Sequence, residues 1–236
     1  MTSDPLRPSN APPASVWLSL LLALVAGGIV WAAIDKAHPV FLVPKEFEAR
    51  SIGLPTAVYE ANRRAQDRVD RNHAMLYLGG LGLLLGVGLG LGAAVPRRSW
   101  LPLAAAPPLG ALGGAAGGML GCLVQEYVRT HVGQAELLHT MGVQLAVAAP
   151  LGTGLGLGLG LAAGKMRPVV ATAAAGLLAG ILVGVAYPVA ISLVLPGANT
   201  DSVLPDDSSS RLFWLGVITG LIGLVLPIAE RRRARV

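Results

Sequence analysis

The chain has 236 residues, of which 53% are hydrophobic and only 13% are charged, with a formal net charge of +5. An ordinary soluble domain carries roughly 25% charged residues. This composition therefore excludes the soluble class and indicates an integral membrane protein. The one cysteine, Cys122, excludes an intrachain disulfide. We attribute the positive charge to membrane topology and contact with the lipid bilayer, and not to nucleic-acid binding.

Six charge-free runs are each long enough for a membrane helix, which needs about 20 apolar residues. We predict an all-α six-helix bundle that spans a membrane at 15–34, 74–95, 101–124, 141–164, 169–195 and 212–229. The remainder is a disordered tail at 1–14, a polar segment at 35–73 and a basic tail at 230–236. Trp17 and Trp31 near the ends of the first span, and Trp214 at the start of the sixth, are typical of interfacial anchors.

The polar segment at 35–73 has two parts. Three prolines, Pro39, Pro44 and Pro55, predict an irregular or interface-hugging path for the first part. The second part contains no helix breaker and should run as a helix directly into the second span. Its charged side chains are spaced i to i+4, as helical ion pairs are: Glu60 with Arg64, Arg63 with Asp67, and Asp67 with Arg71. We interpret this part as a solvated helical extension, with a docking face for a partner protein as the alternative.

Prolines also occur inside the membrane runs. Pro102 and the pair Pro107-Pro108 predict that the first half of the third span is kinked or partly irregular, and Pro188 predicts a bend in the fifth. Neighbouring protein would have to cover the carbonyl groups that a proline leaves without a donor. The third span is therefore expected to lie inside the bundle.

Glycine is concentrated in two similar stretches, at 79–94 and 152–164. On a helix, every second residue turns by about 200°, so alternating glycines form two series on opposite faces. Small residues four apart let helix backbones approach closely in lipid. We therefore predict that the second and fourth spans are central, each with two close neighbours, and that the first and sixth are peripheral. The candidate packing residues are Gly82, Gly86 and Gly90 opposite Gly88 and Gly92, then Gly152, Gly156 and Gly160 opposite Gly154 and Gly158, with Gly176, Gly180 and Gly184 in the fifth span.

The glycines also suggest an internal repeat. The second and fourth spans match at a spacing of 66 to 68 residues, and glycines of the third and fifth match at 66. Gly216 and Gly220 in the sixth span could belong to a truncated third copy. A duplicated helical hairpin explains these matches, and compositional bias is the alternative.

The alternating glycines at 86–92 and 152–160 resemble the inner helix of the proteolipid subunits that form rotary ATPase rings. That resemblance implies an ion-carrying carboxylate in the middle of the following helix, and neither the third nor the fifth span has one. None of the six predicted spans contains an ionisable residue other than Cys122 and tyrosine, which argues against proton relays and ion-coupled transport. The polar residues of the spans are expected to bond to the backbone of a neighbouring helix: Gln144, Thr153, Thr172, Ser192 and Thr219.

The remaining candidate site is the connection after the third span, with Glu126, His131, Glu136 and His139. Glu136 and His139 are three apart, so they form a weak candidate metal pair on one helical face. We favour solvated loop residues there. The sequence contains no nucleophile with a base and no phosphate-binding loop after a strand. We expect no cofactor and no enzymatic activity.

The distribution of basic residues predicts the orientation. Arg97-Arg98, Lys165 with Arg167, and the tail from Arg231 form tight basic groups almost free of acids. The positive-inside rule then favours cytoplasmic termini in a bacterial inner (plasma) membrane. We expect a structural or assembly role through close helix packing. The alternative is a passive channel or transporter for a neutral or lipidic solute.

Overall fold

The structure, a computed structural model, describes residues 14–37, 39–44, 56–131, 137–163, 166–195, 202–205 and 207–234. These residues form α1 (Ala14–Ala37), α2 (Thr56–Arg97), α3 (Leu101–His131), α4 (Leu137–Leu161), α5 (Met166–Val194) and α6 (Ser208–Ala234). All six helices are long and apolar enough to cross a membrane, which confirms the predicted fold, and the described residues contain no strand. The predicted tail lies outside the described residues apart from Ala14, with which α1 begins.

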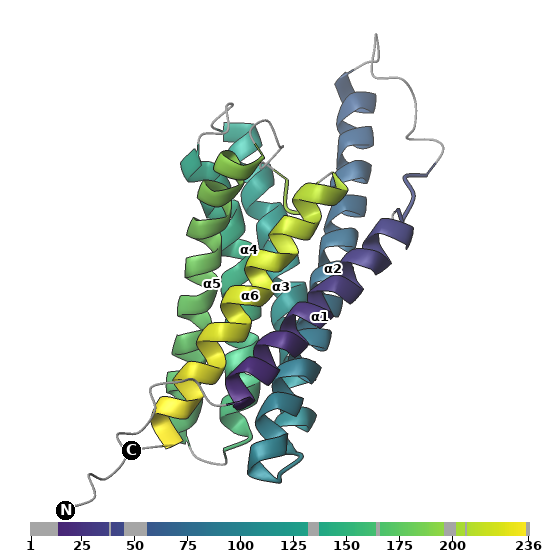
Figure 1. Ribbon diagram of the computed structural model, residues 1–236. Coiled ribbons are helices and arrows are strands. Elements are labelled where there is room, and N and C mark those ends of the chain that lie inside the picture. Colours follow the sequence, from purple (N-terminus) through teal and green to yellow (C-terminus); the bar gives the residue numbers. More distant parts are fainter. Residues whose placement is uncertain are drawn as a thin grey trace, which may run out of the picture.

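Helices adjacent in the chain pack side by side, and α1 and α6 also pack against each other (Figure 1). The start of α1 and the end of α6 therefore lie at one end of the bundle. The ends of α1, α3 and α5 and the starts of α2, α4 and α6 lie at the opposite end, which we call the polar end (Figure 1). There α2 projects well beyond the other helices (Figure 1).

The glycines of α2 lie against two different helices. A Cβ atom on Gly86 would be 2.5 Å from the carbonyl oxygen of Ala106 in α3, and one on Gly90 would be 2.9 Å from that of Pro102. On the opposite face, a Cβ on Gly88 would be 3.2 Å from the backbone of Leu22 in α1. Gly82 likewise faces α3, and Gly92 faces Ser19 of α1. The backbone of α2 thus lies close to a neighbour on each side.

The glycines of α4 are arranged in the same way. Gly152, Gly156 and Gly160 face α5, while Gly154 and Gly158 face α3. A Cβ on Gly158 would be only 2.5 Å from the Cα of Ala106. The three glycines of α5 face α4 in return: Gly176, Gly180 and Gly184. That these contacts hold the bundle together stays a prediction, which substitution tests.

The buried fraction of each helix differs in part from the central and peripheral positions predicted from the sequence. In the apolar part of α2 and of α4, 61% of the residues are buried, against 33% for α1, 28% for α3, 39% for α5 and 44% for α6. The expectation that the third span lies inside the bundle is therefore wrong, because α3 is the least buried helix, and so is the expectation that the sixth span is peripheral. The sixth span lies across the gap between α1 and α5 and reaches α2 and α4 as well. Its large side chains fill that gap: Trp214, Leu215, Ile218, Ile222 and Leu226 are buried.

The prolines do not interrupt the helices. Helical structure continues through Pro107 and Pro108 in α3 and through Pro188 in α5. The expectation of an irregular stretch in α3 is therefore wrong, while the alternative of a kink in α3 and the bend in α5 stay predictions. Pro107 and Pro108 lie within two turns of the start of α3, where α2 comes close through Gly86 and Gly90. Close packing of a neighbour on this side supports helical geometry despite the missing N–H groups.

The hairpin of α2 and α3 and the hairpin of α4 and α5 have equivalent glycine contacts, but the sequence spacing between equivalent residues of α2 and α4 differs from the predicted one. Gly82 faces Gly110 between α2 and α3, and Gly152 faces Gly176 between α4 and α5. The corresponding residues are 70 positions apart in α2 and α4 and 66 apart in α3 and α5. The structural spacing of 70 between α2 and α4 thus differs from the spacing of 66 to 68 residues that the sequence match predicted. Gly216 and Gly220 meet open space and do not share these contacts. Duplication of the hairpin stays a prediction.

Candidate functional site

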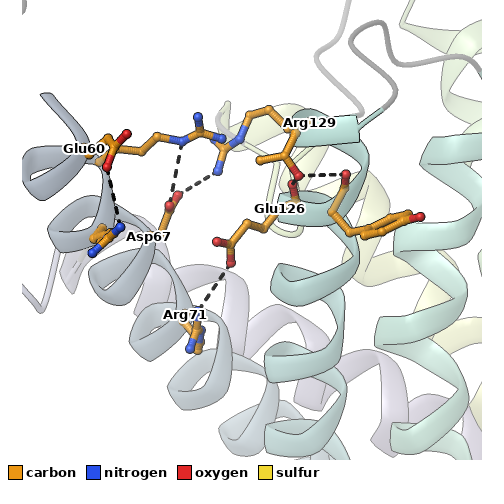
Figure 2. A network of polar contacts seen from close by, with 9 residues as sticks. Glu60, Asp67, Arg71, Glu126 and Arg129 are labelled. Carbon is orange, nitrogen blue, oxygen red and sulfur yellow. Dashed lines mark hydrogen bonds and ion pairs between the residues drawn. The ribbon is translucent and has the colours of Figure 1, made fainter. Parts of the chain in front are cut away.

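Ion pairs connect the projecting part of α2 to the end of α3 (Figure 2). Arg129 Nη2 lies 2.7 Å from Asp67 Oδ1, and Arg71 Nη2 lies 3.6 Å from Glu126 Oε2. Only Asp67, with 15% of its side chain exposed, is well shielded from water. Pairs at such a surface contribute about 0.2 to 1 kcal/mol each. They therefore fix the direction of the projection more than they stabilise the fold.

The pairs along α2 differ in one respect from the sequence prediction. Glu60 with Arg64 and Arg63 with Asp67 are present, at 3.6 and 4.0 Å. Arg71, expected to pair with Asp67, pairs with Glu126 instead. The reason is that α3 continues to His131, about two turns beyond the predicted end of the span, and so lies beside the projection.

The candidate metal residues that the structure describes, Glu126, His131 and His139, form no metal-binding group. Glu126 is ion-paired to Arg71, and His131 stacks on Tyr127 with ring centroids 4.5 Å apart. His139 lies in the first turn of α4, and Glu136 lies outside the described residues. Across the described residues, no three His, Cys, Asp or Glu side chains form a group that could hold a metal ion.

His73 holds the segment that follows α1. Its side chain is 4% exposed, and its Nε2 accepts a hydrogen bond of 2.8 Å from the Phe41 N–H. The ring also stacks on Tyr77, with 5.7 Å between centroids. An Nε2 that accepts a hydrogen bond belongs to a neutral imidazole with its proton on Nδ1. The described residues 39–44 have no regular secondary structure, and Val40 and Leu42 expose apolar side chains there.

The start of α6 is joined to α1. Asp207 caps the helix by accepting a 2.8 Å hydrogen bond from the Ser210 N–H, and hydrogen bonds from the side chain and backbone of Ser210 lower the pKa of Asp207. The Ser208 hydroxyl donates to Asp35 at 2.7 Å, and Trp31 Nε1 donates to the Ser208 carbonyl at 3.1 Å. Trp31 therefore joins α1 to the start of α6 through a hydrogen bond, in addition to lying near the end of the span.

Trp214 is not an interfacial anchor, because only 1% of it is exposed. Its Nε1 donates to Gln144 Oε1 at 2.8 Å, and Gln144 Nε2 donates to the Ser202 carbonyl at 3.4 Å. The predicted bonds to the backbone of a neighbouring helix are wrong. Gln144 bonds to a side chain of α6 and to a loop carbonyl, and the short hydroxyls of the other four polar residues reach a carbonyl three or four residues earlier in their own helix. These bonds are Thr153 to Ala149, Thr172 to Pro168, Ser192 to Val189 and Thr219 to Leu215.

A cavity of about 320 Å³ lies at the polar end, between α2, α3, α6 and the loop before α6. Three of its polar lining residues are themselves buried: His73, Tyr77 and Arg211 are 4%, 8% and 7% exposed. Arg211 Nε donates to the Pro205 carbonyl at 3.2 Å, which fixes the base of its guanidinium group. The described residues that line it are Ile34, Asp70, His73, Ala74, Tyr77, Cys122, Gln125, Ser202, Val203, Leu204, Pro205 and Arg211.

Sequence reasoning missed this cavity, although one signal for it was present. Asp70, His73 and Tyr77 are spaced i, i+3 and i+7, which places them on one face of a helix. The opposite wall comes from 202–205 and Arg211, more than 120 residues later in the chain. No local pattern connects the two walls.

A second hollow, of about 470 Å³, lies between α3, α4 and α5 at the level of the membrane runs. Its walls are almost entirely apolar. Thr153, the one hydroxyl in its lining, bonds to Ala149 of its own helix. The two hollows have no lining residue in common.

Comparison with known proteins does not assign this chain to a family. No protein-family model, no curated protein and no solved structure matches it.

Proposed function

We propose that this multi-pass membrane protein is a scaffold that presents the projecting part of α2 to a protein partner. The observation that carries the proposal is that α2 is a single helix from Thr56 to Arg97. Its apolar half is among the most buried parts of the bundle, and its charged half is ion-paired to α3. A rigid connection between membrane and projection suits a docking element.

The alternative, a passive pathway for a neutral or lipidic solute, would need a continuous route between the helices. The cavity at the polar end and the hollow between α3, α4 and α5 share no described lining residue, and glycine contacts bring helix backbones together between α2, α3, α4 and α5. These observations favour the scaffold over the pathway.

The surface of the projection indicates the chemistry of its partner. Arg64 and Arg68 are four apart on the exposed side of α2, and 81% of the Arg64 side chain is accessible. Glu60 pairs with Arg64 and offsets one of these two charges, so the face keeps a net positive charge, which favours a partner with acidic groups. Reversing both charges should therefore abolish docking without unfolding the bundle, since neither side chain is buried.

Photo-crosslinking in native membranes tests the proposal. A crosslinker at Tyr59, which is 48% exposed, should give one discrete protein adduct. The adduct should disappear in the Arg64→Glu/Arg68→Glu variant and persist in the control Arg64→Lys/Arg68→Lys, which keeps both charges. A crosslinker at Trp100, at the opposite end of the bundle, should not give the same adduct. An adduct unaffected by the charge reversal, or none at Tyr59, would contradict the scaffold role.

We further propose that the protein lies in a bacterial inner (plasma) membrane with both termini in the cytoplasm. The basic groups after α2, before α5 and at the end of α6 support this orientation. A reporter enzyme fused after Arg235 should then be active only if it functions in the cytoplasm. Activity of a reporter that works only on the outer side would reverse the orientation and place the polar end inside.

A further inference from the structure

The cavity at the polar end contains opposite charges from two helices. Asp70 on α2 and Arg211 on α6 both line it, and the amide of Gln125 and the phenol of Tyr77 add neutral hydrogen-bonding groups. Ile34, Val203 and Leu204 supply apolar surface. Its volume of about 320 Å³ is at the lower end of the roughly 300 to 1,000 Å³ typical of ligand pockets. A small molecule or a single head group is the right size.

The walls of the cavity are held by contacts that do not involve a ligand. His73 is fixed by the Phe41 N–H and by stacking on Tyr77, and Arg211 is fixed by the Pro205 carbonyl. Asp70 accepts a 2.9 Å hydrogen bond from Gln66 one turn earlier in α2. Side chains held in this way lose little further freedom when a ligand binds, which favours affinity.

The charges select the kind of ligand. Arg211 favours an anionic group in the cavity, and Asp70 favours a cationic one. We propose that the cavity binds a small zwitterion, with its ammonium group toward Asp70 and its anionic group toward Arg211. Both contacts would then be charge-assisted hydrogen bonds, which are about twice as strong as neutral ones.

Two sources can supply this chemistry. One is a soluble zwitterion, and the other is the ethanolamine phosphate head group of a membrane lipid. The cavity lies where the charged part of α2 gives way to its apolar part, so both sources reach it. This proposal is independent of the scaffold role, because Asp70 and Arg211 differ from the residues assigned to docking.

The test uses the full chain in lipid particles that contain only phosphatidylglycerol. Binding of O-phosphoethanolamine is compared with binding of ethanolamine alone and of inorganic phosphate alone. We expect the zwitterion to bind at least about tenfold more tightly than either single-charge compound. Asp70→Asn should weaken its binding by about tenfold or more, while Glu60→Gln, an exposed carboxylate on the same helix, should leave it unchanged.

Arg211 requires a gentler change because it is buried. Arg211→Lys keeps the positive charge but loses the planar group that binds an anion through two N–H donors. It should weaken the zwitterion's binding, whereas Arg64→Lys on the exposed surface should not. Asp70→Asn keeps the proposal testable if the Arg211 variant does not fold, since the Asp70 side chain is exposed at the edge of the cavity and is not part of the buried core.

A second set of particles with phosphatidylethanolamine identifies the source. If soluble O-phosphoethanolamine does not bind, but phosphatidylethanolamine raises the Tm and remains bound in native mass spectrometry only when Asp70 is intact, the ligand is a lipid head group. The proposal is wrong if neither form binds, if ethanolamine or phosphate alone binds as tightly, or if Asp70→Asn behaves as the wild type.

Discussion

Leucine in place of Gly86 will prevent the bundle from folding. A Cβ at this position would lie 2.5 Å from the Ala106 carbonyl oxygen and 2.5 Å from the Pro107 Cα, both of which are backbone atoms of α3. Backbone atoms cannot move aside as the end of a flexible side chain can, so α2 and α3 would have to separate. Overpacking of a well-packed interior typically costs about 1 to 3 kcal/mol and occasionally more. A leucine side chain between two helix backbones should cost about 3 kcal/mol or more, at or above the upper limit of that range.

The measurement is the yield of monodisperse protein and its thermal unfolding in lipid particles. Alanine at the same position brings the same Cβ contact without the rest of the leucine side chain, so it should lower the Tm by less than leucine does. The matched control is Gly80→Leu in the same helix, where a Cβ meets no atom within 4 Å. Wild-type yield and stability for the Gly86→Leu variant would contradict the packing role and favour compositional drift as the origin of the glycines.

The sequence was most informative about the parts of the fold that depend on short-range pattern. Charge-free runs predict the six membrane helices because lipid excludes unpaired backbone groups and costly charges over a fixed thickness. The projection of α2 was also predictable, since no breaker separates Thr56 from the second span. These features depend on the residues of one segment alone.

Contacts between distant segments could not be predicted. Arg71 has a suitable partner four residues away, yet it pairs with Glu126 because α3 continues past the predicted boundary. Trp214 has the residue type and the sequence position of an interfacial anchor, but it is buried because α6 packs against several other helices. The cavity depends on Asp70 and Arg211 meeting across more than 140 positions of sequence. In each case the deciding neighbour comes from another helix.

Replacing Gln144 by leucine should destabilise the protein by about 1 to 2 kcal/mol. The change leaves the buried Trp214 N–H without its acceptor, and the desolvation penalty of such a group is about 1 to 3 kcal/mol. Hydrogen bonds between helices in lipid are worth about 0.6 kcal/mol on average and at most about 1.7, which keeps the expected cost toward the lower part of that range. Equilibrium unfolding in mixed micelles measures it.

A double-mutant cycle separates the hydrogen bond from the packing. Trp214→Phe removes the donor, and in the Gln144→Leu/Trp214→Phe protein neither partner remains unsatisfied. The double variant should therefore be about 1 kcal/mol more stable than the sum of the two single changes implies. Thr153→Val is the control, since that hydroxyl bonds only to a carbonyl of its own helix and its loss should cost little. Additive single changes would mean that Gln144 and Trp214 stabilise the bundle by volume alone, and that the polar contact joining α4 to α6 is incidental to the fold.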